Sequence, residues 1–201
     1  MRGGRPLSLT GVDLSADNIA GARRLLAGRR VRLQVADACA LPLASRSQDV
    51  ILNLESFGAY PDMGAFLRHV RRMLVPGGLF LHGDLWPAKL VASFLETMEA
   101  LGFVLESLRD VTRQVCRARD RMPSHLMGRL AGTTGVADVQ DYFAAPGSAM
   151  YACLDSGDIV YLLGRWRRGE EQEDDVDASR LDRRTAAIEV LLEEARASLA
   201  D

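Results

Sequence analysis

The feature that most constrains the fold of this chain is a short apolar segment, residues 7–13, that ends in an acid and leads directly into a helix. The alternation of this segment favours a strand, and Ser15 is suited to cap the helix, whose apolar stripe runs until Gly28. A carboxylate at the carboxyl end of a strand can accept hydrogen bonds from both hydroxyls of a ribose. Asp13 is therefore a candidate ligand-binding residue.

The same alternation of strands and helices continues along the chain. Further strands are predicted over residues 31–36, 49–54, 79–84, from 102 onward and over 158–166, and helices over 63–74 and 87–101. Residues 49–54 form a near-continuous apolar run, which is typical of a parallel strand buried on both faces. Strands that alternate with helices imply right-handed crossovers and a parallel sheet. Residues 109–139 are ambiguous, and we interpret them as helical with a break at Pro123.

Charge and cysteine content exclude several classes of protein. The formal net charge of -2 leaves no basic surplus to neutralise phosphates, so we expect no nucleic-acid partner. Three widely spaced cysteines form no CxxC pair, which predicts reduced thiols in the cytoplasm and no metal site. The charged N-terminus lacks an apolar run, so we expect no signal peptide. No segment approaches the roughly 18 apolar residues of a membrane span.

The C-terminal part changes character after residue 168. Residues 169–178 are strongly acidic and predict a solvated linker between a domain over residues 1–168 and a tail over residues 179–201. The tail carries an apolar stripe with helical spacing, formed by Leu181, Ile188, Leu191, Leu192, Ala195 and Leu199. We expect this amphipathic helix to pack on its own domain or on a partner.

Four motifs, in this order along the chain, carry a resemblance to a known family. They are Asp13, Asp37-Ala38, the segment Asn53-Leu54-Glu55 and Pro76-Gly77-Gly78. Together they resemble the middle and end of a class I S-adenosylmethionine-dependent methyltransferase. Tyr60-Pro61, residues 81–85 and Gly147-Ser148 are similar to a narrower group, the phthiotriol dimycocerosate methyltransferases and related natural-product O-methyltransferases. The resemblance implies an α/β, Rossmann-like sheet that is mostly parallel, with an antiparallel last strand.

The resemblance also implies a cofactor, S-adenosylmethionine, and a set of residues that bind it. Asp13 would bind its ribose hydroxyls, and Leu14 would pack against the adenine. Asp37 would accept from the adenine amino group, and the backbone N–H of Ala38 would donate to the ring. Asn53 would lie under the methionine part.

By the same resemblance, the reaction is transfer of the methyl group to an oxygen of a small lipid, polyketide or sugar by in-line displacement. His82 and Glu55 are the candidate catalytic residues, since both lie at strand ends near the expected substrate. We interpret Glu55 as a wall or hydrogen-bonding residue of the pocket rather than as a base. Gly58 stands where close relatives carry a histidine that looks like their general base.

The family's first strand and glycine-rich loop should precede Asp13. In this sequence only residues 1–10 lie there. We therefore expect an N-terminally truncated sheet with a gap between the strands at residues 7–13 and 49–54. A partner chain or a second copy would complete this sheet, or its remaining strands would pair directly. The main alternative function is a non-catalytic methyltransferase-like remnant or interaction subunit.

Two enzyme alternatives fit the motifs less well. A nicotinamide oxidoreductase would require a G-x-G-x-x-G motif, which the sequence lacks. A nucleic-acid methyltransferase would usually show Asn-Pro-Pro-aromatic at the strand end, whereas Asn53 is followed by Leu54 and Glu55.

Overall fold

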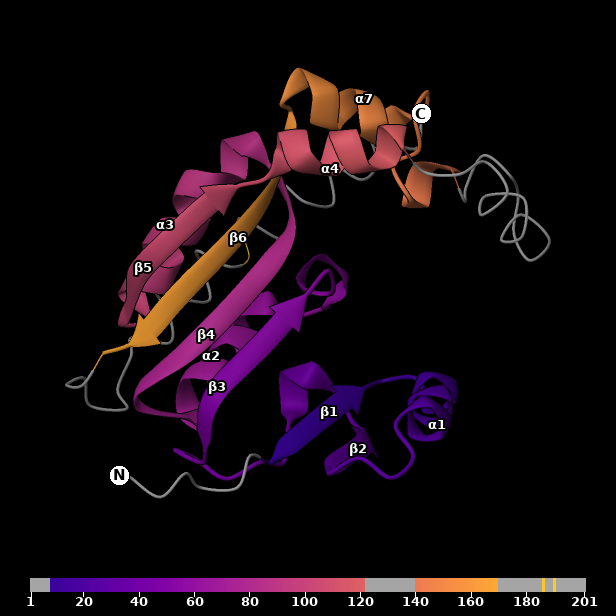
Figure 1. Ribbon diagram of the computed structural model, residues 1–201. Helices are drawn as coiled ribbons and strands as arrows, with labels where there is room; N and C mark the ends of the chain where they lie inside the picture. Colours follow the sequence, from indigo (N-terminus) through magenta and orange to yellow (C-terminus); the bar gives the residue numbers. More distant parts are fainter. Residues whose placement is uncertain (1–7, 122–139, 170–185, 187–189, 191–201) are drawn as a thin grey trace, which may run out of the picture.

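The computed structural model describes residues 8–121 and 140–169, together with Ala186 and Val190. Strands and helices alternate along most of this part (Figure 1). The strands are β1 (Leu9–Asp13), β2 (Val31–Val35), β3 (Gln48–Leu54), β4 (Leu74–Pro87), β5 (Phe103–Asp110) and β6 (Ile159–Arg168). The helices are α1 (Ala16–Leu25), α2 (Met63–Met73), α3 (Val91–Ala100), α4 (Thr112–Asp120) and α7 (Ala149–Ser156). The expected acidic linker and most of the tail lie outside the described residues.

The strands form two separate sheets. β1 pairs in parallel with β2, and the larger sheet has the order β3-β4-β6-β5. β3 is parallel to β4, whereas β6 runs antiparallel to both β4 and β5. The predicted α/β class, mostly parallel with an antiparallel last strand, is therefore confirmed.

Local sequence explains the ends of the first helix. The side chain of Ser15 accepts a hydrogen bond from the backbone N–H of Asn18, as expected of an N-cap. The chain turns after α1 at Gly28, whose φ of 79° lies in the left-handed region that glycine adopts without strain. Ile19 lies on the inward side of this helix and is almost fully buried.

The fourth strand differs from the prediction at both ends. We expected Pro76-Gly77-Gly78 to separate a helix from a strand over residues 79–84, but β4 already begins at Leu74 and passes through these residues. Its pairing with β3 shifts register between Gln48 and Val50, which accommodates the irregular segment. Pro87 ends β4 instead of lying within the next helix, because β6 continues to pair with β4 up to this residue.

Helices α2 and α3 cover one face of the larger sheet (Figure 1), and the core lies between this face and the two helices. It is rich in aromatic side chains, among them Phe57, Phe80, Trp86, Phe94 and Trp166. The ring of Trp166 lies over Gly164, where an added Cβ would come 1.9 Å from the ring atom Cη2. Glycine at this position is what allows the indole to occupy the core.

Replacing Gly164 with alanine should therefore destabilise the fold by about 1–3 kcal/mol, because the indole must leave its position. Urea unfolding measures this change. Gly21→Ala is the matched control, since its nearest neighbour would lie 3.8 Å away on helix α1 and alanine favours helix. A Gly164→Ala variant as stable as the Gly21→Ala variant would contradict the packing described here.

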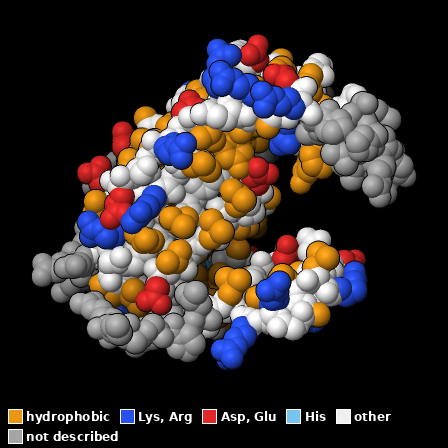
Figure 2. Space-filling view, in the orientation of Figure 1, with side chains coloured by type: hydrophobic (Ala, Val, Ile, Leu, Met, Phe, Trp, Pro, Cys, Tyr) orange, Lys and Arg blue, Asp and Glu red, His pale blue; other side chains and the backbone are white. Residues whose placement is uncertain are grey.

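The edge of the larger sheet at β3 is open. β1 forms hydrogen bonds with β2 and not with β3, so the expectation that the remaining strands pair directly is wrong. The expectation that residues 49–54 form a buried strand is also wrong, since Val50, Leu52 and Leu54 are 50%, 68% and 56% exposed. Ile51, on the other face of this strand, packs against the core. Figure 2 shows a hollow between the β1–β2 part and the larger sheet, with hydrophobic side chains on its walls.

Candidate functional site

The first half of the candidate site lies at the carboxyl ends of β1 and β2. Oδ1 of Asp13 accepts a hydrogen bond from the backbone N–H of Ser15 at 2.7 Å. Both carboxylate oxygens of Asp13 lie within 3.3 Å of the side-chain nitrogen of Asn18. These contacts fix the carboxylate at the start of α1. Leu14 beside it is 74% exposed, so its side chain is an open apolar surface.

Asp37 is held in a similar way at the end of β2. Its Oδ1 accepts from the backbone N–H of Cys39 at 2.8 Å and so caps the single turn Ala38–Ala40. Because Asp13 pairs with Val35 in register, Asp37 lies just beyond the strand pair at the same edge. The structure thus brings Asp13, Leu14, Asp37 and Ala38 together, and both carboxylates also serve as local caps.

The second half of the candidate site lies at the end of β3 and at the residues of β4 beside it. The side-chain nitrogen of Asn53 donates to Ser56 Oγ and to the Tyr60 hydroxyl, at 2.8 Å each. The Asn53 oxygen lies 3.1 Å from Nδ1 of His82, which places the imidazole proton on Nδ1. Asn53 is 6% exposed, so this network sits beneath the surface of the site.

His82 is surrounded by aromatic rings. Its ring centroid lies 5.2 Å from that of Phe57 and 5.6 Å from those of Phe80 and Phe94, and the residue is 3% exposed. Burial lowers the pKa of His82 to about 4, so the ring is neutral near pH 7. The Nε2 atom is buried and has no hydrogen-bond partner among the described residues. A catalytic role for His82 stays a prediction, and the contacts seen are those of a residue that orients Asn53.

The neutral state of His82 makes stability depend on pH. Its pKa in the folded chain is lower than the ordinary 6.5, so the unfolded chain binds more protons between pH 4 and 6.5. The contribution of His82 to the free energy of unfolding is therefore fully present above pH 6.5 and is lost as the pH falls toward 4. We expect the free energy of unfolding to drop by about 2 kcal/mol from pH 7 to 5 through this group alone. Urea unfolding of wild type and His82→Leu at both values measures it, and an equal drop in both proteins would contradict the assignment.

Glu55 lies directly after β3 with a φ of 49°, an uncommon backbone conformation for a side chain of this size. Its backbone N–H donates to the carbonyl of Gly83, and its Oε1 accepts from the Tyr161 hydroxyl at 2.7 Å. Burial, followed by the neighbouring Glu55, raises the pKa of Tyr161, so the phenol stays protonated. Glu55 is exposed, which leaves its second oxygen open to a ligand.

Asp84 completes this side of the site. It is 7% exposed and accepts from the backbone N–H groups of Phe57 and Leu85 at 2.9 and 2.8 Å. Burial raises the pKa of Asp84, and the backbone hydrogen bonds counteract part of that effect. Sequence reasoning did not assign roles to Asp84, Tyr60 or Tyr161. Asp84 is an acid at the end of the predicted strand, although β4 continues to Pro87. Tyr161 reaches Glu55 only through the antiparallel pairing of β6 with β4.

The two halves of the candidate site face each other across the hollow between β1 and β3 (Figure 2). Asp13, Asp37 and Asn53 lie at or just beyond carboxyl ends of parallel strands, where ligands bind in open α/β sheets. The described residues contain no group of three or more His, Cys, Asp or Glu side chains that could hold a metal ion. None of the helices in the described ranges has the length and apolar character needed to cross a membrane.

Sequence comparisons connect this geometry with known proteins. Residues 2–82 match the family model described as "Methyltransferase domain". The phthiotriol/phenolphthiotriol dimycocerosates methyltransferase of Mycobacterium tuberculosis is 32% identical over 173 residues, which are 79% of this chain and 60% of the relative. A fatty-acid O-methyltransferase of Mycolicibacterium smegmatis is 32% identical over 117 residues, 58% of this chain and 43% of the relative. The chain thus spans about 60% of the length of the first of these relatives.

Solved structures share the fold at lower identity. The O-methyltransferase region of StiE superposes with a TM-score of 0.66 at 19% identity, covering 90% of this chain and 66% of that one. A geranyl diphosphate methyltransferase in complex with S-adenosylmethionine gives a TM-score of 0.57 at 18% identity, covering 80% and 68%. The cyclase SpnF gives 0.58 at 23% identity, covering 82% and 67%. These likenesses establish the fold.

Proposed function

The chain is related by sequence and fold to the class I S-adenosylmethionine-dependent methyltransferases, and on that premise we propose that it takes part in O-methylation of a small lipid or polyketide. The observation that carries the proposal is the pair of carboxylates, Asp13 and Asp37, at the ends of adjacent parallel strands. The lipid-related names of the two mycobacterial relatives support the substrate class. The free thiols of all three cysteines support a cytoplasmic location.

The residues at the ends of β1 and β2 fit the adenosine half of S-adenosylmethionine. The carboxylate of Asp13 is already oriented by Ser15 and Asn18, and the ribose hydroxyls would donate to it. Leu14 would cover one face of the adenine, and Asp37 would accept from its amino group. When bound, the cofactor supplies a methyl group on a positively charged sulfur.

The residues at the ends of β3 and β6 would orient the acceptor. Tyr161 stays protonated and holds one oxygen of Glu55, so the other oxygen is directed for a hydrogen bond from an acceptor hydroxyl. Such positioning supplies much of the rate of an in-line displacement, and a positioned general base would add about 10²–10⁴-fold. Asn53 would support the methionine part through the bonds that Ser56, Tyr60 and His82 make to it.

The methionine part would also border the hollow between β1 and β3. We propose that an extended strand of a partner chain fills this hollow, because both strands have a free edge and run in the same direction (Figure 1). The exposed apolar side chains of Val50, Leu52 and Leu54 favour a partner that covers the adjoining face as well. The same exposure favours the second candidate function, an interaction subunit without catalysis of its own.

Calorimetric titration of S-adenosylhomocysteine into the purified chain, with a thermal melt of the same sample, tests the proposal. We expect micromolar binding by a cooperatively unfolding protein, and methyl transfer to hydroxylated lipids should then be assayed. A cooperative melt without binding would reject a cofactor site in the chain alone and would favour the interaction subunit. Recovery of binding with a co-purified partner would assign the site to the assembly.

A further inference from the structure

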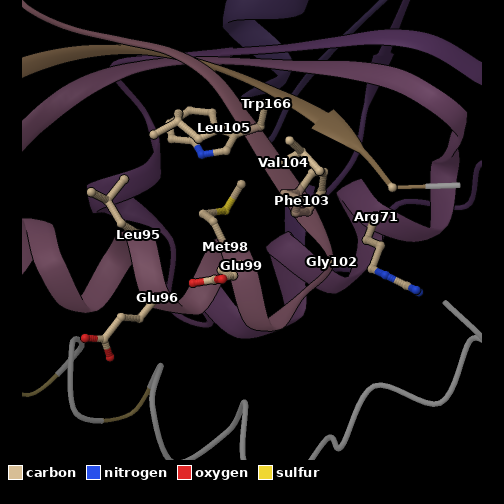
Figure 3. A pocket seen from close by; sticks show the side chains of 11 residues that line it. Arg71, Leu95, Glu96, Met98, Glu99, Gly102, Phe103, Val104, Leu105 and Trp166 are labelled. Carbon is tan, nitrogen blue, oxygen red and sulfur yellow. The ribbon is translucent and has the colours of Figure 1, made fainter. Parts of the chain in front are cut away.

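A pocket lies between α3 and β5, on the face of the larger sheet that α3 covers. It has a volume of about 530 Å³, and Figure 3 shows side chains from both elements around it. Leu95, Met98, Leu105 and the ring of Trp166 make its wall apolar. Apolar exposure continues along the edge strand β5, where Val104 and Leu105 are 45% and 43% exposed.

The chain leaves the sheet at this pocket. Gly169 lines it, and the backbone N–H of Gly169 donates to the carbonyl of Gly102 at 3.0 Å. The acidic linker of residues 170–178 and the tail of residues 179–201 follow from here. Nine linker residues can span at most about 30 Å, so every part of the pocket is within reach of the tail.

The tail has two described residues. Ala186 and Val190 are helical and exposed, Val190 by 54%. Being four residues apart, they share one side of a helix. If the whole tail is a helix of 3.6 residues per turn, the opposite side would carry the apolar stripe of Leu181, Ile188, Leu191, Leu192, Ala195 and Leu199. An isolated helix of this length is only marginally stable in water, so the stripe requires an apolar surface.

We propose that the apolar stripe of the tail docks on its own chain, in the pocket between α3 and β5. Residues 181–199 as a helix would be about 28 Å long, and the eight residues of β5 extend over about 27 Å. In such a helix Arg184 would lie on the same side as the stripe, and Glu99 lines the pocket on α3, so their charges are complementary. Val104 and Leu105 line the pocket and are partly exposed, and a helix along β5 would cover them.

Two single substitutions, one on each side of the tail helix, test this docking in the full-length chain. Leu191→Asp places a charge in the stripe and should lower the melting temperature by about 5 °C, since each kcal/mol corresponds to about 2–4 °C in a chain of this size. Val190→Asp is the matched control on the exposed side and should shift it by less than 1 °C. Equal effects of the two variants, large or small, would overturn the proposal.

Hydrogen exchange of the wild-type chain and of both variants gives a second measurement. The amides of residues 188–199 should exchange slowly, and those of β5 should exchange faster in Leu191→Asp than in Val190→Asp. Light scattering distinguishes docking on the same chain from docking on a second copy of the chain. A wild-type dimer that Leu191→Asp converts to a monomer would assign the tail to a second copy and would overturn docking on the same chain.

Discussion

Replacement of Asp13 by alanine is expected to abolish measurable binding of S-adenosylhomocysteine. The variant would lose the acceptor of two ribose hydroxyls, and each hydrogen bond to a charged group contributes about 1.5–3 kcal/mol. The dissociation constant should therefore rise by about 10²-fold or more, which takes a micromolar site out of range of direct titration calorimetry. Unchanged affinity would reject the cofactor site proposed at the ends of β1 and β2.

The controls separate binding from local folding. Asp13 also accepts from the backbone N–H of Ser15 and from Asn18, so its removal weakens the start of α1. Asp13→Asn keeps an oxygen for Ser15 but removes the charge, and we expect it to weaken binding by about 10-fold. Asp17→Ala, in the first turn of the same helix, perturbs the helix without touching the ligand and should bind normally. A loss of binding in Asp17→Ala equal to that in Asp13→Ala would mean that only helix stability was measured.

Replacement of Trp166 by alanine is expected to cause the largest loss of stability of any single truncation in the core. The indole is 1% exposed and lies 5.9 Å from the ring of Phe80 and 5.6 Å from that of Phe94, centroid to centroid. Truncation of a buried tryptophan costs about 3–5 kcal/mol, against a total stability of about 5–15 kcal/mol for a typical domain. Urea unfolding measures the change.

Tyr142→Ala is the matched control, since this aromatic side chain is 83% exposed and should contribute little. The double variant Gly164→Ala with Trp166→Ala adds a further check. Once the indole is absent, the added methyl group has nothing to displace, so the second substitution should cost much less than it does alone. Additive effects of the two substitutions would contradict the contact between these residues.

The local elements of this chain follow from short-range sequence patterns. Ser15 caps α1 through Asn18 because a hydroxyl at that position reaches the free N–H groups of the first turn. Asp13 and Asp37 lie at one edge because two parallel strands of the same direction must end at the same edge. The cofactor half of the candidate site could therefore be proposed from the residues and the family resemblance alone.

The acceptor half of the candidate site depended on pairing between distant strands. Tyr161 meets Glu55 across 106 positions of sequence, and no local pattern encodes that contact. His82 looked accessible because it precedes a strand end, yet its side chain points into the aromatic core, since alternate residues of β4 face opposite sides. The apolar run of residues 49–54 was interpreted as fully buried because composition cannot tell which face a neighbouring element covers.

The alternation of strands and helices, the caps, and the acids at the strand ends follow from local sequence, because they depend on residues that are close together along the chain. The separation of β1–β2 from the larger sheet, the free edge of β3, and the bond from Tyr161 to Glu55 are seen only in the folded chain. Strand order and burial are set by which apolar faces meet, and that is a property of the whole folded chain.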